Sequence, residues 1–355
     1  MKIEENISLA RFTTLEVGGP ARYYCCVESE DELMEAVQFS RDRKLPLFVL
    51  GGGSNLVIAD SGFGGLVIHI AIHGTLLEWS ADGSPKVVCR VPAGVDWNDF
   101  VQRTCAAGYV GVESLAGIPG TVGGSPVQNI GAYGQEVAQT IQTVRAFDLR
   151  KFEFVELTAA QCEFAYRHSI FNTSERGRYI VTRVDFALDT MAKVTLNYAE
   201  LQQHFADKSV PSPMEVYEAV RTIRARKGML IDAENPSADS RSAGSFFKNP
   251  VVSARVLKDI LETLPPDEGT VPHWPTEDGR VKLAAAWLIE HSGFKKGYAL
   301  GRVGISSKHT LALVNRTGDA SCEELLRLRD LIVLTVEQRF GVTLAMEPVL
   351  LGFNP

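Results

Sequence analysis

The chain has 355 residues, of which 45% are hydrophobic and 22% are charged, and its formal net charge is −7. This composition is typical of a soluble globular protein of about two domains. The net negative charge and the lack of a long basic block argue against a nucleic-acid-binding or membrane-surface protein.

The sequence also lacks the marks of exported, membrane and metal-binding proteins. Its first residues contain no apolar core like that of a signal peptide, and no apolar stretch is long enough to span a bilayer. The six cysteines include no C-x-x-C pair, and the histidines have no metal-binding spacing. We therefore expect a cytoplasmic protein with free, buried thiols and no structural metal.

The first part of the chain predicts a small α/β unit. Residues 22–27 have strand character, and a capping box beginning at Ser29 predicts a helix. The apolar runs 45–50 and 65–72 predict two further strands. The β-α-β order is typical of a sheet with parallel neighbours.

Two glycine-rich runs stand out. The first, Gly-Gly-Gly-Ser-Asn at 51–55, directly follows a predicted strand, and the second covers residues 118–134. Such runs bring main-chain N–H groups close to a phosphate, and two of them indicate a ligand with a diphosphate. Neither run is a Walker loop or a G-x-G-x-x-G fingerprint, and a purely structural loop is the alternative.

The remaining elements show one change of composition. Strands are predicted at 87–91, 144–149, 152–157 and 179–188, with a helix from Asp96 to about Gly108 and mostly β structure up to 199. At 210–213 the composition shifts, and Ser212 caps a helix. Beyond this boundary we expect helices at 253–264, 282–292 and 321–340 and strands at 310–315 and 343–351.

Three residues lie in stretches with unusual chemistry. Arg167 lies among aromatic residues, although a surface arginine covering a ring explains the pattern equally well. Ser245 follows a glycine, but it lacks the G-x-S-x-G elbow and can be a simple strand entry. Glu347 lies in an apolar run and needs either a partner or a water-facing edge position.

Six motifs in this order resemble the UDP-N-acetylenolpyruvoylglucosamine reductase family. They are Gly-Gly-Gly-Ser-Asn (51–55), Ile-Pro-Gly-Thr-Val-Gly-Gly (118–124), Gln-Asn-Ile-Gly-Ala-Tyr-Gly (128–134), Tyr-Arg-x-Ser-Ile-Phe (166–171), Gly-Ser-Phe-Phe-Lys-Asn-Pro (244–250) and Glu-Pro-Val (347–349). The likeness extends from about Thr13 to Leu351. The part from Arg22 to Leu188 also resembles the wider flavin-binding fold of vanillyl-alcohol oxidase.

The resemblance implies an α+β protein with a two-subdomain FAD-binding fold and a smaller α/β substrate domain. We expect FAD-binding subdomains at 1–72 and 73–211, a substrate domain at 212–340 and a returning C-terminal strand at 341–355. Many members of the wider family tether FAD through a histidine beside the first glycine loop. Ser54 and Asn55 occupy that place here, which implies noncovalent FAD.

The resemblance also implies a reaction. NADPH reduces FAD, and a hydride then passes to the vinyl carbon of UDP-N-acetylglucosamine enolpyruvate, giving UDP-N-acetylmuramate for peptidoglycan. Arg167 and Glu347 match residues at the substrate carboxylate, where Glu347 is protonated or holds Arg167. Ser245 matches the proton donor, and a nearby cation such as Lys227 or Lys248 is expected to assist it.

Further site residues are implied by their positions in the motifs. The expected FAD contacts are Gly51, Gly52, Gly53, Ser54, Asn55, Ile118, Pro119, Gly120, Gly123, Gly124, Ser125, Asn129, Gly131, Ala132 and Arg224. The expected substrate contacts are Tyr133, Tyr198, Lys227, Lys248, Asn249 and His309.

One segment departs from the family pattern. Residues 228–242 form a longer stretch than usual, with Ser242 in place of the customary asparagine, which leaves the pose of Lys227 open. His309 can equally be a structural histidine. We expect the protein to act as a monomer.

Two other functions remain open. An oxidase of the same flavin fold would pass electrons to oxygen and make peroxide. A non-catalytic nucleotide-sugar-binding module would bind UDP-sugars without flavin and would be colourless.

Overall fold

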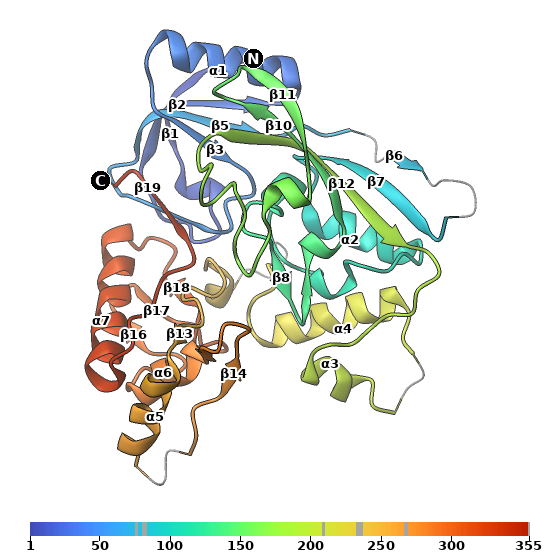
Figure 1. Cartoon of the computed structure of the whole chain (residues 1–355). Helices are drawn as coiled ribbons and strands as arrows, with labels where there is room; N and C mark the ends of the chain where they lie inside the picture. Colours follow the sequence, from blue (N-terminus) through green and yellow to red (C-terminus); the bar gives the residue numbers. More distant parts are fainter. Residues whose placement is uncertain (75–76, 80–83, 208–209, 232–236, 266–268, 354–355) are drawn as a thin grey trace. The chain divides into compact units, whose positions relative to one another are not determined.

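The computed structural model describes residues 1–74, 77–79, 84–207, 210–231, 237–265 and 269–353. Its helices and mixed sheets make it an α+β protein, as expected. The chain forms two compact units (Figure 1). The first unit contains Met1–Ile7, Ala21–Gly53 and Gly64–Ala225, and the second contains Ser8–Pro20, Ser54–Phe63 and Arg226–Pro355.

A four-stranded sheet begins the first unit, in the order β1 (Glu4–Ser8), β2 (Pro20–Val27), β5 (Phe63–Ile70) and β3 (Leu47–Leu50). Strands β3 and β5 are parallel, with Leu50 opposite His69. Helix α1 (Glu30–Asp42) begins at Ser29, whose hydroxyl accepts a hydrogen bond from the Glu32 N–H at 3.2 Å. Because β3 ends at Leu50, the first glycine run begins at the C-terminal end of a parallel strand.

A five-stranded antiparallel sheet forms the rest of the first unit, and its strands β10, β12 and β7 lie side by side in Figure 1. Its order is β11 (Glu153–Thr158), β10 (Ile141–Asp148), β12 (Tyr179–Asp189), β7 (Lys86–Pro92) and β6 (Leu77–Trp79). Helix α2 (Trp97–Ala106) places Trp97 and Phe100 against Phe186 of β12, with ring centroids 5.9 and 4.8 Å apart. Helices α3 (Ala199–His204) and α4 (Pro213–Arg226) follow.

The second unit gathers distant segments around a separate core. It contains α5 (Ala254–Thr263), α6 (Ala285–His291), α7 (Cys322–Phe340), a sheet of β13 (Val251–Val252), β15 (Val281–Leu283) and β14 (His273–Pro275), and a sheet of β16 (Ala299–Leu300), β17 (Val303–Ile305) and β18 (Leu313–Asn315). Strand β4 (Leu56–Ile58) pairs in parallel with β19 (Val349–Leu351). Leu15, Val17 and Val57 join this core, which explains why two early segments belong to the second unit.

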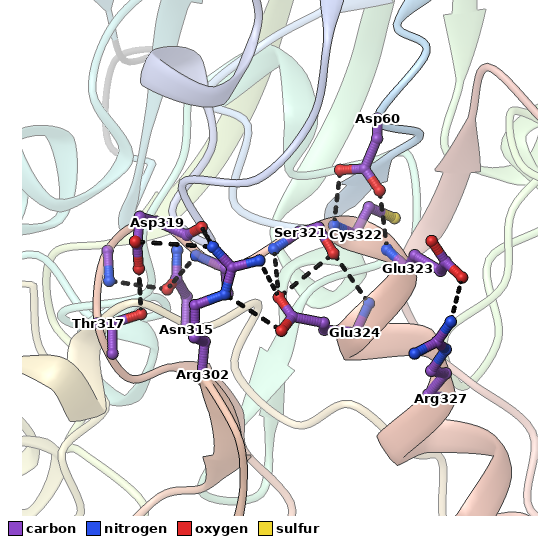
Figure 2. A network of polar contacts seen from close by, with 12 residues as sticks. Asp60, Arg302, Asn315, Thr317, Asp319, Ser321, Cys322, Glu323, Glu324 and Arg327 are labelled. Atoms are coloured by element: carbon purple, nitrogen blue, oxygen red, sulfur yellow. Dashed lines mark hydrogen bonds and ion pairs between the residues drawn. The ribbon is translucent and has the colours of Figure 1, made fainter.

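Helix α7 begins in a network of polar contacts (Figure 2). Ser321 and Glu324 form a reciprocal capping box, and Arg302 contacts Glu324 at 2.9 Å. The two carboxylate oxygens of Asp60 accept hydrogen bonds from the backbone N–H groups of Cys322 and Glu323 at 2.8 and 2.9 Å. Asp60 thereby fastens the segment after β4 to a helix that lies far away in sequence.

Four expected elements differ from the structure, and one of them is the strand expected at 310–315, which is confined to Leu313–Asn315. The helix expected at 282–292 begins only at Ala285, because residues 281–283 pair in β15 and the Asn249 side chain accepts a hydrogen bond from the Ala285 N–H at 3.0 Å. The strand expected at 343–351 is confined to Val349–Leu351. The β structure expected at 194–199 is absent from these described residues, and Tyr198 instead precedes α3.

Helix α4 belongs to the first unit, whose last segment ends at Ala225, and the last segment of the second unit begins at Arg226. The four expected segments stay a prediction, since contacts alone do not assign FAD or substrate binding to them. Among the residues that the structure describes, none of the helices combines the length and the apolar character needed to cross a bilayer.

Candidate functional site

The two glycine runs lie against each other in the first unit. A methyl group at Gly52 would lie 2.5 Å from the Cα of Gly120, and one at Gly51 would lie 3.0 Å from the Thr121 hydroxyl. Side chains at these positions would therefore separate the runs. We call this pair of closely packed runs the cradle, because glycine-rich backbone of this kind can bind a diphosphate through main-chain N–H groups.

Polar side chains secure both ends of the second run. The Gly117 N–H donates to Asn98 at 2.9 Å, and Arg224 donates to the Gly117 carbonyl at 3.0 Å. Arg224 is only 6% exposed; burial lowers the pKa of its guanidinium, while charge and hydrogen bonding from Tyr133 act in the opposite direction. Arg224 thus contacts Gly117 before the run and Tyr133 near its end. No local motif in the sequence marks Asn98 for this task.

The later part of the run folds back on itself. Ser125 is buried and donates to the Val122 carbonyl at 2.7 Å, and Gly131 and Ala132 form β8, which pairs with β9 (Gln135–Glu136). The Asn129 amide donates to Glu136 at 2.8 Å and to the Ala165 carbonyl at 3.0 Å, and it accepts from Ala138. Its side chain is therefore committed to the loop, so we expect any ligand contact to come from its backbone.

Arg167 lies at a tight turn beside this run. Its φ of +53° is in the left-handed region, and the bonds between Ala165 and His168 close the turn around it. The guanidinium donates to the Gly131 carbonyl at 3.0 Å, and Asn172 donates to the Arg167 carbonyl at 3.1 Å. A left-handed conformation at a non-glycine residue is costly, and such residues are concentrated at functional sites.

An aromatic pair completes the site residues of the first unit. The ring of Tyr198 lies edge-on to that of Tyr133, with centroids 5.2 Å apart. Tyr198 is 42% exposed and immediately precedes α3, so its ring can contact a ligand from solvent.

The second unit brings Ser245 and Glu347 onto adjacent segments. The Glu347 N–H donates to the Phe246 carbonyl at 2.9 Å, and the Lys248 N–H donates to the Ala345 carbonyl at 2.9 Å. The Phe246 N–H donates to the Leu311 carbonyl at 2.7 Å. The segment that carries Ser245 and Lys248 is therefore hydrogen-bonded to the segment that carries Glu347. Through the Phe246 N–H it is also bonded to Leu311, which lies two residues after His309.

The remaining residues of the second unit have defined local contacts. Asn55 accepts from the Val349 N–H at 2.9 Å and contacts the Glu347 carbonyl at 3.4 Å, and Ser54 precedes it. The side chain of Asn249 caps α6, and Nδ1 of His309 accepts from the Leu311 N–H at 3.2 Å. Lys227 follows α4 directly. Within the long 228–242 segment, residues 232–236 lie outside the described residues.

The site residues thus fall into two groups. Gly51, Gly52, Gly53, residues 118–133, Arg167, Tyr198 and Arg224 belong to the first unit, and Ser54, Asn55, Lys227, Ser245, Lys248, Asn249, His309 and Glu347 belong to the second.

Comparisons with known proteins identify both parts of the chain. The profile of a family described as "FAD binding domain" matches residues 21–151, and that of "UDP-N-acetylenolpyruvoylglucosamine reductase, C-terminal domain" matches residues 235–351. Proteins named UDP-N-acetylenolpyruvoylglucosamine reductase are 47% identical in Thermobifida fusca, covering 98% of this chain and 97% of the relative, and 45% identical in Streptomyces coelicolor, covering 97% and 89%. The crystal structure of such a reductase from Thermus caldophilus is 28% identical, with a TM-score of 0.64 over 99% of both chains.

Proposed function

Because the chain belongs to the UDP-N-acetylenolpyruvoylglucosamine reductase family, we propose that it reduces UDP-N-acetylglucosamine enolpyruvate to UDP-N-acetylmuramate, with FAD as cofactor and NADPH as reductant. The product is a precursor of peptidoglycan. The observation that carries this proposal within the structure is the pairing of the Ser245 and Glu347 segments through Phe246.

The cradle formed by the glycine runs fits noncovalent FAD. The backbone of Gly51–Gly53 and of 118–120 would bind the diphosphate. Further contacts would come from Gly123, Gly124, Ser125, Asn129, Gly131, Ala132, Ser54, Asn55 and Arg224. Bound FAD supplies hydride transfer from NADPH to the substrate. The residues of the chain have to bind and orient the partners and to manage charge and one proton.

Arg167 would stabilise the negative charge that develops during reduction. Hydride adds to the terminal vinyl carbon, and the electron pair of the double bond moves to the adjacent carbon and into the carboxylate. A guanidinium can donate two parallel hydrogen bonds to that carboxylate. Its turn already fixes the Arg167 backbone on both sides, which reduces reorganisation during the reaction. Glu347 would carry a proton at the same carboxylate.

Ser245 would donate the proton that completes the reduction. Its hydroxyl gives a proton to the carbon that received the electron pair, and one proton from solvent restores the serine. A serine is a weak acid, so Lys227 or Lys248 would assist it. Tyr198, Tyr133, Asn249 and His309 would bind the rest of the sugar nucleotide.

We further propose that the protein works as a monomer in the cytoplasm. All six cysteines are free and five of them are buried, as expected in a reducing compartment.

Anaerobic spectroscopy of the purified protein tests the function. We expect a yellow protein whose flavin absorbance is bleached by NADPH and restored by the enolpyruvyl substrate. Steady NADPH consumption with equivalent peroxide and no need for that substrate would instead identify an oxidase. A colourless protein that binds UDP-sugars would identify a binding module.

A further inference from the structure

We propose that Asp239 is a positioning residue for the substrate diphosphate, because it fastens the loop that carries His309 to the segment that carries Lys227. This inference rests on the proposed function. It assigns a task to a residue within the long 228–242 segment, where the chain departs from the family pattern.

Both carboxylate oxygens of Asp239 are used within the second unit. Asp239 lies in the short helical turn η6 (Ala238–Ser240) and is 9% exposed. One oxygen accepts from the Ser307 N–H and the other from the Ser307 hydroxyl, each at 2.7 Å. Burial raises the pKa of the Asp239 carboxyl, but hydrogen bonds from Ser307 and Ser306 lower it by more. The pKa is therefore below its ordinary value, and the carboxylate is ionised at neutral pH.

The loop that Asp239 contacts is itself well ordered by hydrogen bonds. The hydroxyl of Ser306, which is 1% exposed, accepts from the N–H groups of Lys308 and His309 at 3.1 and 3.2 Å. The Ala312 N–H donates to the His309 carbonyl at 3.1 Å. Because Nδ1 of His309 accepts from the Leu311 N–H, the ring N–H lies on Nε2, which makes that atom a hydrogen-bond donor.

Asp239 also contacts the segment after α4. A methyl group at Gly228 would lie 2.9 Å from the Asp239 Cβ and 3.3 Å from the Lys308 Cδ. The backbone of the Lys227 segment therefore packs directly on Asp239 and on the aliphatic stem of Lys308. Two lysines and an imidazole donor are the groups that bind a diphosphate. Asp239 brings the backbone segments of Lys227, Lys308 and His309 together. Its own negative charge is stabilised by hydrogen bonds from Ser307 and by the nearby Lys308.

Binding of UDP and of uridine to the intact, flavin-loaded protein tests this role. In Asp239→Ala the two charge-assisted hydrogen bonds from Ser307 are lost, so the loop that carries His309 is no longer fixed. We therefore expect UDP affinity to fall about tenfold, while uridine affinity stays unchanged. In turnover, the KM for the enolpyruvyl substrate should rise more than kcat falls. Asp239→Asn retains an acceptor for the Ser307 N–H and should recover most of the affinity.

Asp278→Asn is a matched control. Asp278 accepts hydrogen bonds from Thr276 and Arg280 in another turn of the second unit, and it is exposed. This variant should bind UDP like the unchanged protein. The inference is overturned if Asp239→Ala weakens UDP and uridine equally, leaves UDP binding intact or tightens it. Turnover of the unchanged protein tests the proposed function separately, since the UDP titration requires no chemistry.

Discussion

The residues on either side of Ser245 fix the position of its backbone. Gly244 has a φ of +69°, so the chain turns immediately before the serine. Phe246 and Phe247 are at most 1% exposed and pack edge to face, with centroids 5.5 Å apart. A half-buried serine between a left-handed glycine and two buried rings has little freedom to move its backbone, which suits a positioned proton donor.

We predict that Ser245→Ala impairs only the second half-reaction. NADPH should reduce the flavin at close to the normal rate, whereas reoxidation by the enolpyruvyl substrate should slow by about 10² to 10⁴, the usual contribution of a positioned acid. Ser245→Cys should retain more activity, because a thiol still donates a proton. Stopped-flow flavin absorbance follows both steps. Slower reduction with unchanged reoxidation would exclude Ser245 as the acid, and equal slowing would indicate a misplaced flavin.

Tyr198 and Lys227 are predicted to act in binding. Tyr198→Ala removes a ring packed edge-on against Tyr133, and Lys227→Ala removes a cation. Each change should raise the KM for the sugar nucleotide more than it lowers kcat, since the proposed contacts would be made both before and during the reaction. Steady-state kinetics at saturating NADPH makes the comparison. A large loss of kcat at constant KM would assign the residue to the chemical step.

The glycine runs offer a matched pair of substitutions at the scale of one loop. A methyl group at Gly124, which is exposed, would meet only the Thr121 hydroxyl at 3.8 Å, whereas one at Gly123 would lie 2.6 Å from the Ala93 Cβ. Gly124→Ala should therefore keep its thermal stability but bind FAD at least about tenfold more weakly, because the new methyl group would occupy space that the proposed cofactor needs.

Gly123→Ala should instead lose stability, with or without flavin. Thermal unfolding and flavin titration separate the two effects. Normal flavin affinity in Gly124→Ala would mean that this face of the run does not contact the cofactor.

We predict that Asp148, at the end of β10, makes the stability of the first unit depend on pH in acid. Asp148 is buried and is contacted by Arg178 at 2.6 Å, and its pKa is lowered to about 2, mainly by hydrogen bonds from Arg178. A lowered folded-state pKa stabilises the fold above the ordinary value near 3.8, and that stabilisation is lost as the pH falls toward about 2.

Asp148→Asn should therefore lower the free energy of unfolding at neutral pH by roughly 2 kcal/mol and flatten its dependence on pH between about 4 and 2. Urea unfolding at a series of pH values measures both effects. An unchanged acid slope in this variant would show that other carboxylates set it.

The sequence predicted the helix starts that depend on residues close together in the chain. The caps at Ser29, Asp96 and Ser212 are confirmed, because each depends on a side chain and a backbone group three residues apart. The start of α6 could not be predicted in this way, since it depends on Asn249 and on the pairing of β15. Likewise, the apolar run at 343–351 has strand character, but only its last three residues find a partner in β4.

At the scale of the molecule, six ordered motifs were sufficient for the family, and the FAD-binding part has the vanillyl-alcohol-oxidase type of fold, as predicted. The adjacency of Ser245 and Glu347 came only from the resemblance, because their segments lie about a hundred residues apart and no local rule links them. The assignment of 8–20 and 54–63 to the second unit could not be predicted, since it depends on core contacts of Leu15, Val17 and Val57.

We predict that Asp60 stabilises the second unit without affecting the flavin cradle. Asp60→Ala leaves the N–H groups of Cys322 and Glu323 without this cap and should lower the free energy of unfolding by about 1–2 kcal/mol. Asp60→Asn should be milder. Asp319→Ala, which removes an exposed carboxylate 3.6 Å from Arg302, is the control and should change stability little. Hydrogen exchange of the first α7 amides locates the effect, and equal protection in Asp60→Ala would refute it.

The parallel pair β4–β19 also bears on synthesis in the cell. At about 5–20 residues per second, the ribosome needs roughly 15–60 s to travel from Leu56 to Val349. During that interval the first unit, whose segments all precede residue 226, can close, while Leu15, Val17 and Val57 await the rest of their core. The second unit is therefore the part of a nascent chain that exposes apolar surface longest to chaperones and proteases. A fragment starting at Arg226 would carry this exposure permanently, because the early segments that complete its core would be missing.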